Sequence, residues 1–180
     1  MSMRFIFQFL LATVAAAGTL FAGDQTDAER TKQPVAVAIL VAGAATADGP
    51  VGNVQVTYAD GTKDLWTTKG NCSLAGVAPD GTVGWTVNGS EIRVNSADMM
   101  RPNRTLILCR KGKVLASIKS GRAFIEKWAF SANGSQLVLV TRGSHGPADI
   151  ELHDTATGRL IQSVRAYAEN LPEWARPYAE

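Results

Sequence analysis

The chain has 180 residues, of which 46% are hydrophobic and 19% are charged, the composition of an ordinary soluble domain. Its 18 basic and 16 acidic residues leave a formal charge of +2, which is too small to indicate a nucleic-acid partner. The length is sufficient for one domain with a real core.

The N-terminus has the layout of a secretory signal peptide. Arg4 is the only charged residue before Asp24, and the run 5–14 is apolar except for Gln8 and Thr13. Small residues follow, and we expect cleavage after position 22, which makes residues 1–22 the signal peptide. An uncleaved membrane anchor is the alternative, but the apolar run is shorter than the roughly 20 residues that a membrane helix needs.

We therefore expect a secreted or periplasmic protein with no membrane span after cleavage. Residues 23–33 are polar and predict a flexible N-terminal arm.

A β domain is predicted over residues 34–166, because short apolar runs are separated by turn residues such as Asp60-Gly61 and Asn88-Gly89. The expected strands lie at 35–42, 54–58, 63–67, 73–78, 83–87, 91–95, 105–109, 113–118 and, as four further runs, between 124 and 164. These are about twelve strands, enough for three four-stranded antiparallel sheets.

Three of the turns share one formula, in which a small residue or proline precedes Asp or Asn, then Gly, then Thr or Ser. They are centred on Asp60-Gly61, Asp80-Gly81 and Asn133-Gly134, and the last two occupy equivalent places in the strand pattern. The glycine of each turn supplies the positive φ angle that a tight hairpin requires. The formula therefore indicates an internal repeat.

Residues 128–140 read WAFSANGSQLVLV and resemble the TolB-type and tryptophan-aspartate β-propeller repeat, in which an aromatic-Ser-Pro-Asp-Gly turn joins the inner two strands of a blade. Residues 152–160, LHDTATGRL, resemble the outer hairpin of that repeat. The resemblance covers roughly residues 72–164 and implies an all-β, propeller-like array of about three four-stranded antiparallel sheets. A β-sandwich or barrel is the alternative.

The two cysteines, Cys72 and Cys109, both follow the predicted cleavage site. An even number of cysteines in a secreted protein favours a disulfide, which we expect between them. Two buried free thiols are the alternative, since the sequence does not show the close Cα approach that a bridge requires.

One dense polar cluster is present, formed by His145, Asp149, Glu151, His153 and Asp154. Glu151 and His153 are two apart on a predicted strand, so they share a face and are candidates for metal binding or acid–base chemistry. The competing interpretation is a polar stripe facing solvent, and we favour it because no further ligand stands at metal-site spacing.

A second charged group is basic and could bind an anion or an acidic surface. Its members are Arg101, Arg104, Arg110, Lys111 and Lys113. The alternative is a solvated face balanced by acids elsewhere, as the near-zero net charge suggests.

Two of the tryptophans are assigned to packing between sheets. Trp85 and Trp128 alternate with apolar neighbours, which favours a place between adjacent sheets over a stacking platform for a ligand. Residues 167–180 form a C-terminal tail in which Pro172 favours a short helical turn, and Trp174 and Tyr178 are expected to dock on the sheet.

No nucleophile elbow and no phosphate-binding glycine loop occurs in the sequence. We therefore expect a non-catalytic binding protein that needs no cofactor and takes a protein partner, or associates with itself, through open sheet edges. The alternative is a small secreted hydrolase or metal-dependent enzyme that uses the Glu151 and His153 region.

Overall fold

The computed structural model describes residues 32–40, 51–89, 92–93, 99–100, 102–143 and 145–179. The expected signal peptide, and all but the last two residues of the expected arm, lie outside this range. Among the described residues, no helix is both long and apolar enough to cross a membrane.

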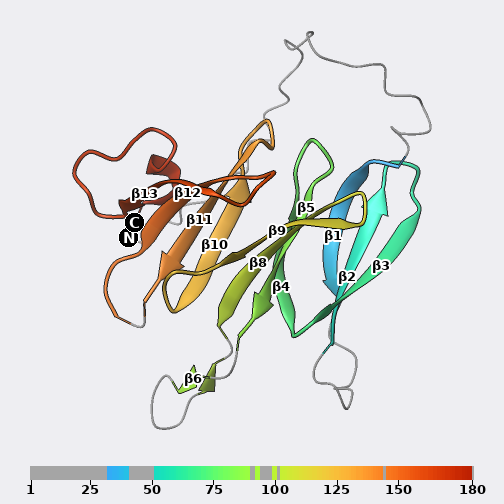
Figure 1. Cartoon of the computed structure of the whole chain (residues 1–180), viewed down its shortest axis with the longest axis horizontal. Helices are drawn as coiled ribbons and strands as arrows, with labels where there is room; N and C mark the ends of the chain where they lie inside the picture. The colour runs from blue at the N-terminus through green and yellow to red at the C-terminus, as the bar shows by residue number, and fades with distance from the viewer. Residues whose placement is uncertain are drawn as a thin grey trace, which may run out of the picture.

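The described residues form antiparallel β-sheets and one short 3-10 turn (Figure 1). The strands are β1 (Pro34–Leu40), β2 (Val51–Tyr58), β3 (Lys63–Lys69), β4 (Cys72–Val77), β5 (Val83–Asn88), β6 (Ile92–Arg93), β7 (Met99–Met100), β8 (Asn103–Arg110), β9 (Lys113–Lys119), β10 (Phe124–Phe130), β11 (Gln136–Arg142), β12 (Asp149–Asp154) and β13 (Leu160–Arg165), and the turn is η1 (Arg176–Tyr178).

Three main sheets lie side by side, with the strand orders β1-β2-β3, β4-β5-β8-β9 and β10-β11-β12-β13. Their first strands are neighbours, since β1 contacts β4 and β10 contacts both β4 and β8. Figure 1 shows the sheets as successive blades, with the first at the right and the last at the left. This arrangement confirms the propeller-like all-β array, although the first sheet has three strands within the described residues.

One predicted strand does not join a blade. The run 91–95 was expected between the strands at 83–87 and 105–109, but β5 pairs directly with β8, from Val83 opposite Cys109 to Asn88 opposite Asn103. Strand β6 pairs with β7 in a separate two-stranded sheet. The intervening segment is therefore an insertion between two neighbouring strands of the central sheet.

The repeated turns have the same internal structure. In each, the side-chain Oδ1 of Asp60, Asp80 or Asn133 accepts a hydrogen bond from the backbone N–H two residues later, at 2.9, 2.9 and 3.1 Å. The following glycines all have positive φ, between 74° and 80°. The Asp80 and Asn133 turns each join the first two strands of a four-stranded sheet, which confirms that they are equivalent.

Two apolar layers hold the three sheets together. The first sheet packs on the central sheet through Val54, Val56, Val83 and Trp85, all of them buried. The central and third sheets pack through a second buried cluster, which contains Leu106, Leu108, Ile118, Ile125, Leu137 and Leu139. Each sheet is thus held by the burial of alternating residues on a facing surface.

The outer face of the third sheet is covered by the chain's own tail. Val138, Val140, Ile150 and Leu152 are buried there, and Leu171, Trp174, Ala175 and Tyr178 pack against them. The indole N–H of Trp174 donates to Gln162 Oε1 on β13 at 3.2 Å. The docking expected for Trp174 and Tyr178 is therefore confirmed.

Candidate functional site

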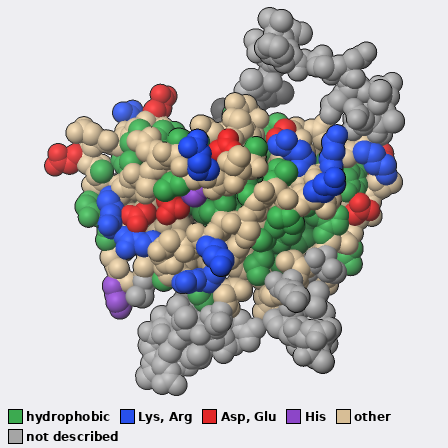
Figure 2. Space-filling view, viewed as in Figure 1, with side chains coloured by type: hydrophobic (Ala, Val, Ile, Leu, Met, Phe, Trp, Pro, Cys, Tyr) green, Lys and Arg blue, Asp and Glu red, His purple; other side chains and the backbone are tan. Residues whose placement is uncertain are grey.

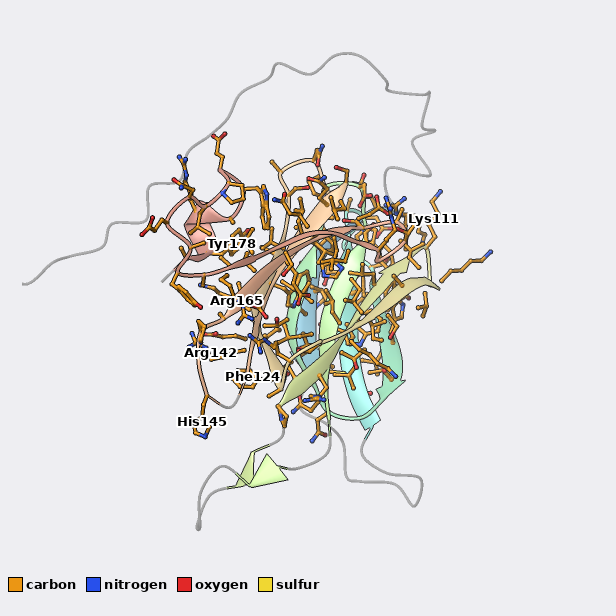
Figure 3. All side chains as sticks on the ribbon, turned by 60° about the vertical axis from the view of Figure 1, so that its left-hand side comes forward. Lys111, Phe124, Arg142, His145, Arg165 and Tyr178 are labelled. Carbon is orange, nitrogen blue, oxygen red and sulfur yellow. The ribbon has the colours of Figure 1, made fainter. Side chains whose placement is uncertain are left out.

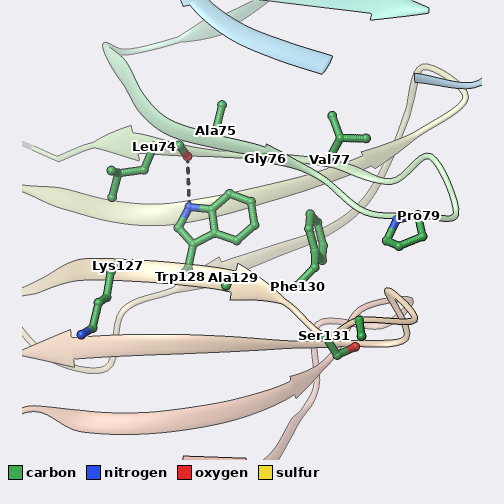
Figure 4. Close-up of a pocket in the computed structure, with 11 residues that line it drawn as sticks. Leu74, Ala75, Gly76, Val77, Pro79, Lys127, Trp128, Ala129, Phe130 and Ser131 are labelled. Atoms are coloured by element: carbon green, nitrogen blue, oxygen red, sulfur yellow. Dashed lines mark hydrogen bonds between the residues drawn. The ribbon is translucent and has the colours of Figure 1, made fainter. Parts of the chain in front are cut away.

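A groove lies between the first strands of the central and third sheets, and its volume is about 450 Å³ (Figure 4). The lining residues are Leu74, Ala75, Gly76, Val77 and Pro79 from β4 and its turn, and Lys127, Trp128, Ala129, Phe130, Ser131 and Ala132 from β10 and its turn. Most of them are apolar, and Lys127 carries the one formal charge in this lining. The groove can therefore hold an apolar group, whereas the Lys127 side chain extends to the side of β10 opposite Trp128 (Figure 4).

The wall formed by β4 contains an irregular residue. The register of β4 with β5 shifts between Ser73 and Ala75, so Leu74 is a bulge. Its φ of 42° is left-handed, a conformation that costs a residue with a side chain free energy. The Leu74 side chain is 42% exposed. Strained residues of this kind gather at functional sites, where the surroundings hold them in place.

Trp128 forms the floor of the groove and also joins two sheets. Its Nε1–H donates to the Leu74 carbonyl at 3.0 Å, as Figure 4 shows. Its ring meets Phe130 edge to face, with centroids 5.1 Å apart and an interplanar angle of 88°. A Cβ on Gly76 or Gly84 would lie 3.1 or 2.6 Å from the Trp128 ring, so these glycines leave room for the indole.

The two expected core tryptophans thus differ in their surroundings. Trp85 is 4% exposed and belongs to the cluster between the first two sheets, which confirms its packing role. Trp128 is half-buried, packs against the cluster between the second and third sheets, and lines the groove as well.

Both walls of the groove are edge strands. Each of β4 and β10 has one neighbour in its own sheet, β5 or β11. No backbone hydrogen bond joins β4 to β10 within the part of the chain that the structure describes. The edges of the two strands therefore offer backbone donors and acceptors alongside an apolar floor, the arrangement that recruits extended segments of other chains.

Glu151 and His153 do lie together, but not on a solvent-facing stripe. His153 is 5% exposed, and its Nε2 lies 3.1 Å from Glu151 Oε2. Its Nδ1 lies 3.0 Å from the carbonyl oxygen of Gly158, which can only accept, so Nδ1 is the donor. The Thr141 hydroxyl donates to the other Glu151 oxygen at 3.1 Å.

The expectation of solvent exposure is corrected because this face of β12 is the one that packs against the central sheet. His153 and Glu151 stand opposite Leu137 and Leu139, which belong to the cluster between the two sheets. Both imidazole nitrogens already have partners. No set of three or more His, Cys, Asp or Glu residues that could hold a metal occurs among the described residues.

The other members of the polar cluster are dispersed. Asp149 holds two guanidinium groups, from Arg122 at 2.5 Å and Arg165 at 3.1 Å. Asp154 accepts from Thr157 in the turn before β13, and these hydrogen bonds lower the pKa of its carboxyl. His145 is exposed and points away from the sheets (Figure 3).

The expected disulfide is absent, because both cysteines are free. Cys72 stands opposite Val87, Val87 stands opposite Thr105, and Cys109 is four residues beyond Thr105. Two strand spacings and four residues along a strand separate the two Cα atoms by about 16 Å. A bridge requires at most about 7 Å, so this topology prevents it.

The basic residues do not form one patch. Arg104 and Arg110 stand at opposite ends of β8, and Arg110 pairs with Asp80 and donates to Thr82 Oγ1 at 2.9 Å. Lys111 lies at the tip of the β8–β9 hairpin (Figure 3), and Lys113 begins β9. Arg101 lies outside the described residues. The anion-binding patch is therefore divided along a strand about 20 Å long.

The groove was not predicted from the sequence. Leu74 lies in an ordinary apolar run, and nothing there signals a bulge. The sequence does carry one signal of the groove, which is the presence of glycine within two strands. Gly76 and Gly84 face the Trp128 ring from the neighbouring strands β4 and β5.

Neither a family model nor a curated protein matches this sequence. Among solved structures, the β-propeller domain of the Trilobed protease from Pyrococcus furiosus, described as having an open velcro topology, is similar at 12% identity and a TM-score of 0.47. The match covers 81% of this chain and 42% of that one, so the chain spans less than half the length of that structure. No match supports the TolB-type and tryptophan-aspartate family itself, and the propeller-like description rests on the arrangement of the three sheets.

Proposed function

We propose that this chain is a non-catalytic binding protein, and that the groove between β4 and β10 receives an apolar segment of a protein partner. The observation that carries the proposal is that two edge strands, β4 and β10, flank an aromatic floor. Backbone groups on the walls match an extended segment, and the Trp128–Phe130 pair offers an apolar surface for its side chains.

The position of the groove supports this function. Its floor is fixed by the hydrogen bond from Trp128 to Leu74 and by packing on Gly76 and Gly84. A rigid floor reduces the entropy lost on binding.

The enzymatic alternative receives less support from the same structure. His153 is 5% exposed, and its two nitrogens are engaged by Gly158 and Glu151. A general acid or base must reach the proton that it transfers, whereas this pair lies in the interface between two sheets.

The location that we propose for the protein, secreted or periplasmic, rests on the layout of residues 1–22.

The test is a selection of phage-displayed decapeptides on the full chain, followed by affinity measurements on the selected peptides. Leu74→Asp places a carboxylate on the groove wall at a residue whose φ aspartate tolerates. We expect at least a tenfold loss of affinity. Leu160→Asp is the matched control, because Leu160 is a half-exposed leucine on β13, away from the groove.

Equal affinities of the two variants would place the peptides elsewhere and contradict the proposal. Thermal unfolding of both variants checks that the fold is intact. N-terminal sequencing of the protein recovered from the envelope or medium tests the location, and a start at position 23 is expected.

A further inference from the structure

We infer that the free edge of β3 is a second binding site, which takes an extended, acidic-flanked segment of another protein as the fourth strand of the first sheet. The central and third sheets each have four strands, whereas the first has three among the described residues. The missing position lies beside β3, whose one neighbour in its sheet is β2. This inference concerns a site separate from the groove and stands independently of it.

A pocket marks the position of the missing strand. It has a volume of about 240 Å³ and lies between β3 and the β8–β9 hairpin. Its lining residues are Trp66, Thr68, Trp85, Ile107, Cys109, Gly112 and Val114. Figure 2 shows hydrophobic side chains gathered between the first and central sheets on this face, with Lys and Arg side chains above them.

The two sides of β9 differ in how they are covered. On the side of the third sheet, Ala116 and Ile118 are buried. The turn before β13 lies on them, as the position of Gly158 shows, because a Cβ added there would be 2.7 Å from Ala116. On the side of the first sheet, Val114 stands opposite Cys109 and is 65% exposed. A fourth strand in the first sheet would cover Val114 as the third sheet covers Ala116.

The edge strand carries one large apolar side chain on each of its faces. Trp66 faces the pocket, and Leu65, on the opposite face of β3, is 56% exposed. An added strand would place alternate side chains next to each of them. Exposed edges with apolar neighbours are the templates on which a further chain pairs.

A buried donor in the pocket also lacks a partner. Trp85 lines the pocket, and its Nε1–H has no hydrogen-bond partner within the described residues. Such a donor costs free energy until an acceptor reaches it. A carbonyl brought in by an extended segment would supply that acceptor once the indole turns toward the pocket.

Charge indicates which segments fit. Lys111 and Lys113 flank Gly112 at the rim of the pocket and are exposed, as is Lys63 at the start of β3. Asp64 on β3 accepts from the Tyr58 hydroxyl at 2.7 Å. The lysines thus outnumber the one carboxylate, Asp64, around the pocket, and acidic residues flanking the added strand complement this net positive charge. The sequence 23–33 lacks the alternating apolar residues expected of such a strand, since Ala28 is its one apolar residue other than glycine.

The test uses the full chain and a labelled peptide, acetyl-Glu-Glu-Val-Thr-Val-Thr-Val-Glu-Glu-amide, with fluorescence anisotropy as the readout. We expect measurable binding below about 1 mM and at least a tenfold loss when alternate peptide amides are N-methylated, since methylation removes the strand donors. Hydrogen exchange should show new protection of the β3 amides. No binding at that concentration, or equal binding of the methylated peptide, overturns the inference.

Variants locate the site. Val114→Asp should lower affinity at least tenfold, whereas Leu160→Asp and the groove variant Leu74→Asp should leave it unchanged. A loss with Leu74→Asp instead of Val114→Asp assigns the peptide to the groove and overturns the inference. So does a dimer of the full chain that Val114→Asp dissociates, because a second copy would then be the occupant.

Discussion

The indole N–H of Trp128 on β10 donates to the main-chain carbonyl of Leu74 on β4, across 3.0 Å and between two sheets. The acceptor belongs to a bulge residue with a φ of 42°, so a strained backbone unit is held by a side chain from the neighbouring blade. Because the same indole is the floor of the groove, the shape of the groove and the packing of the two sheets depend on one side chain.

Leu74→Gly should stabilise the fold. Glycine adopts a positive φ without the penalty of roughly 1–2 kcal/mol for a residue with a Cβ, and this gain exceeds its own entropy cost of about 0.5–1 kcal/mol. We expect the free energy of unfolding in urea to rise by up to about 1 kcal/mol. Leu65→Gly, on the regular edge strand β3, is the control and should lower it. A decrease in both variants would show that Leu74 is not strained.

Gly84→Ala should destabilise the interface between the central and third sheets. The added Cβ would lie 2.6 Å from the Trp128 ring and 3.2 Å from Leu108. We expect a loss of about 1–3 kcal/mol by chemical denaturation, as for overpacking in a core. Gly121→Ala is the control, because nothing lies within 4 Å of its Cβ, and its effect should stay within about 0.5 kcal/mol. Equal effects of the two substitutions would contradict the packing of Trp128 on Gly84.

Local signals in the sequence were sufficient for most of the sheet array. The turns at Asp80-Gly81 and Asn133-Gly134 depend on side-chain and glycine chemistry within four residues, so they could be predicted and placed as equivalent. Alternation along β5 and β10 also placed Trp85 and Trp128 on apolar faces. These features require no knowledge of which strands meet.

Features that depend on long-range pairing could not be predicted. Whether Cys72 can reach Cys109 depends on β5 pairing with β8 across the insertion that contains β6 and β7. Whether His153 is exposed depends on whether another layer covers its face of β12. The central sheet covers that face, and the C-terminal tail covers the other. The groove combines both problems, because it lies between edges of different sheets and includes a bulge that pairing with β5 creates.

Glu151 and His153 should be coupled in stability. Removing one partner leaves a buried polar atom of the other without its hydrogen bond, so Glu151→Leu and His153→Leu should each cost about 1–3 kcal/mol. The double variant should cost clearly less than the sum, with a coupling of at least about 1 kcal/mol in a double-mutant cycle. Additive losses would show that the 3.1 Å contact contributes nothing to folding.

The thiols should be free but slow to react. Burial raises the pKa of Cys72 from 9.0 to about 11, and it also raises the pKa of Cys109. Both should be titrated by a thiol reagent in urea without reductant, and alkylation of the folded chain at pH 8 should be much slower than in urea. Because the pKa of the Cys72 thiol is higher in the folded chain than in the unfolded chain, ionisation of the thiol opposes folding. The free energy of unfolding should therefore keep its full value below pH 9.0, the ordinary pKa, and fall progressively between pH 9.0 and about 11. Fewer than two thiols in urea would contradict the separation of the two strands.

The C-terminal tail should stabilise the fold because it covers the outer face of the third sheet. Terminal units of repeat-like folds need a cover over the apolar face that no further unit buries. Here that cover is made by Leu171, Trp174, Ala175 and Tyr178. Trp174→Ala should cost about 2–4 kcal/mol, through lost burial and the lost hydrogen bond to Gln162.

Deletion of residues 167–180 should lower the melting temperature further and cause aggregation, because Val138, Val140, Ile150 and Leu152 would then be exposed together. Light scattering and thermal unfolding measure both effects. Tyr167→Ala is the matched control within the tail, since Tyr167 is 68% exposed and its removal should change stability by less than about 0.5 kcal/mol. A truncated chain that stays monomeric with an unchanged melting temperature would mean that the third sheet is stable without its cover, and that its outer face is available to a partner.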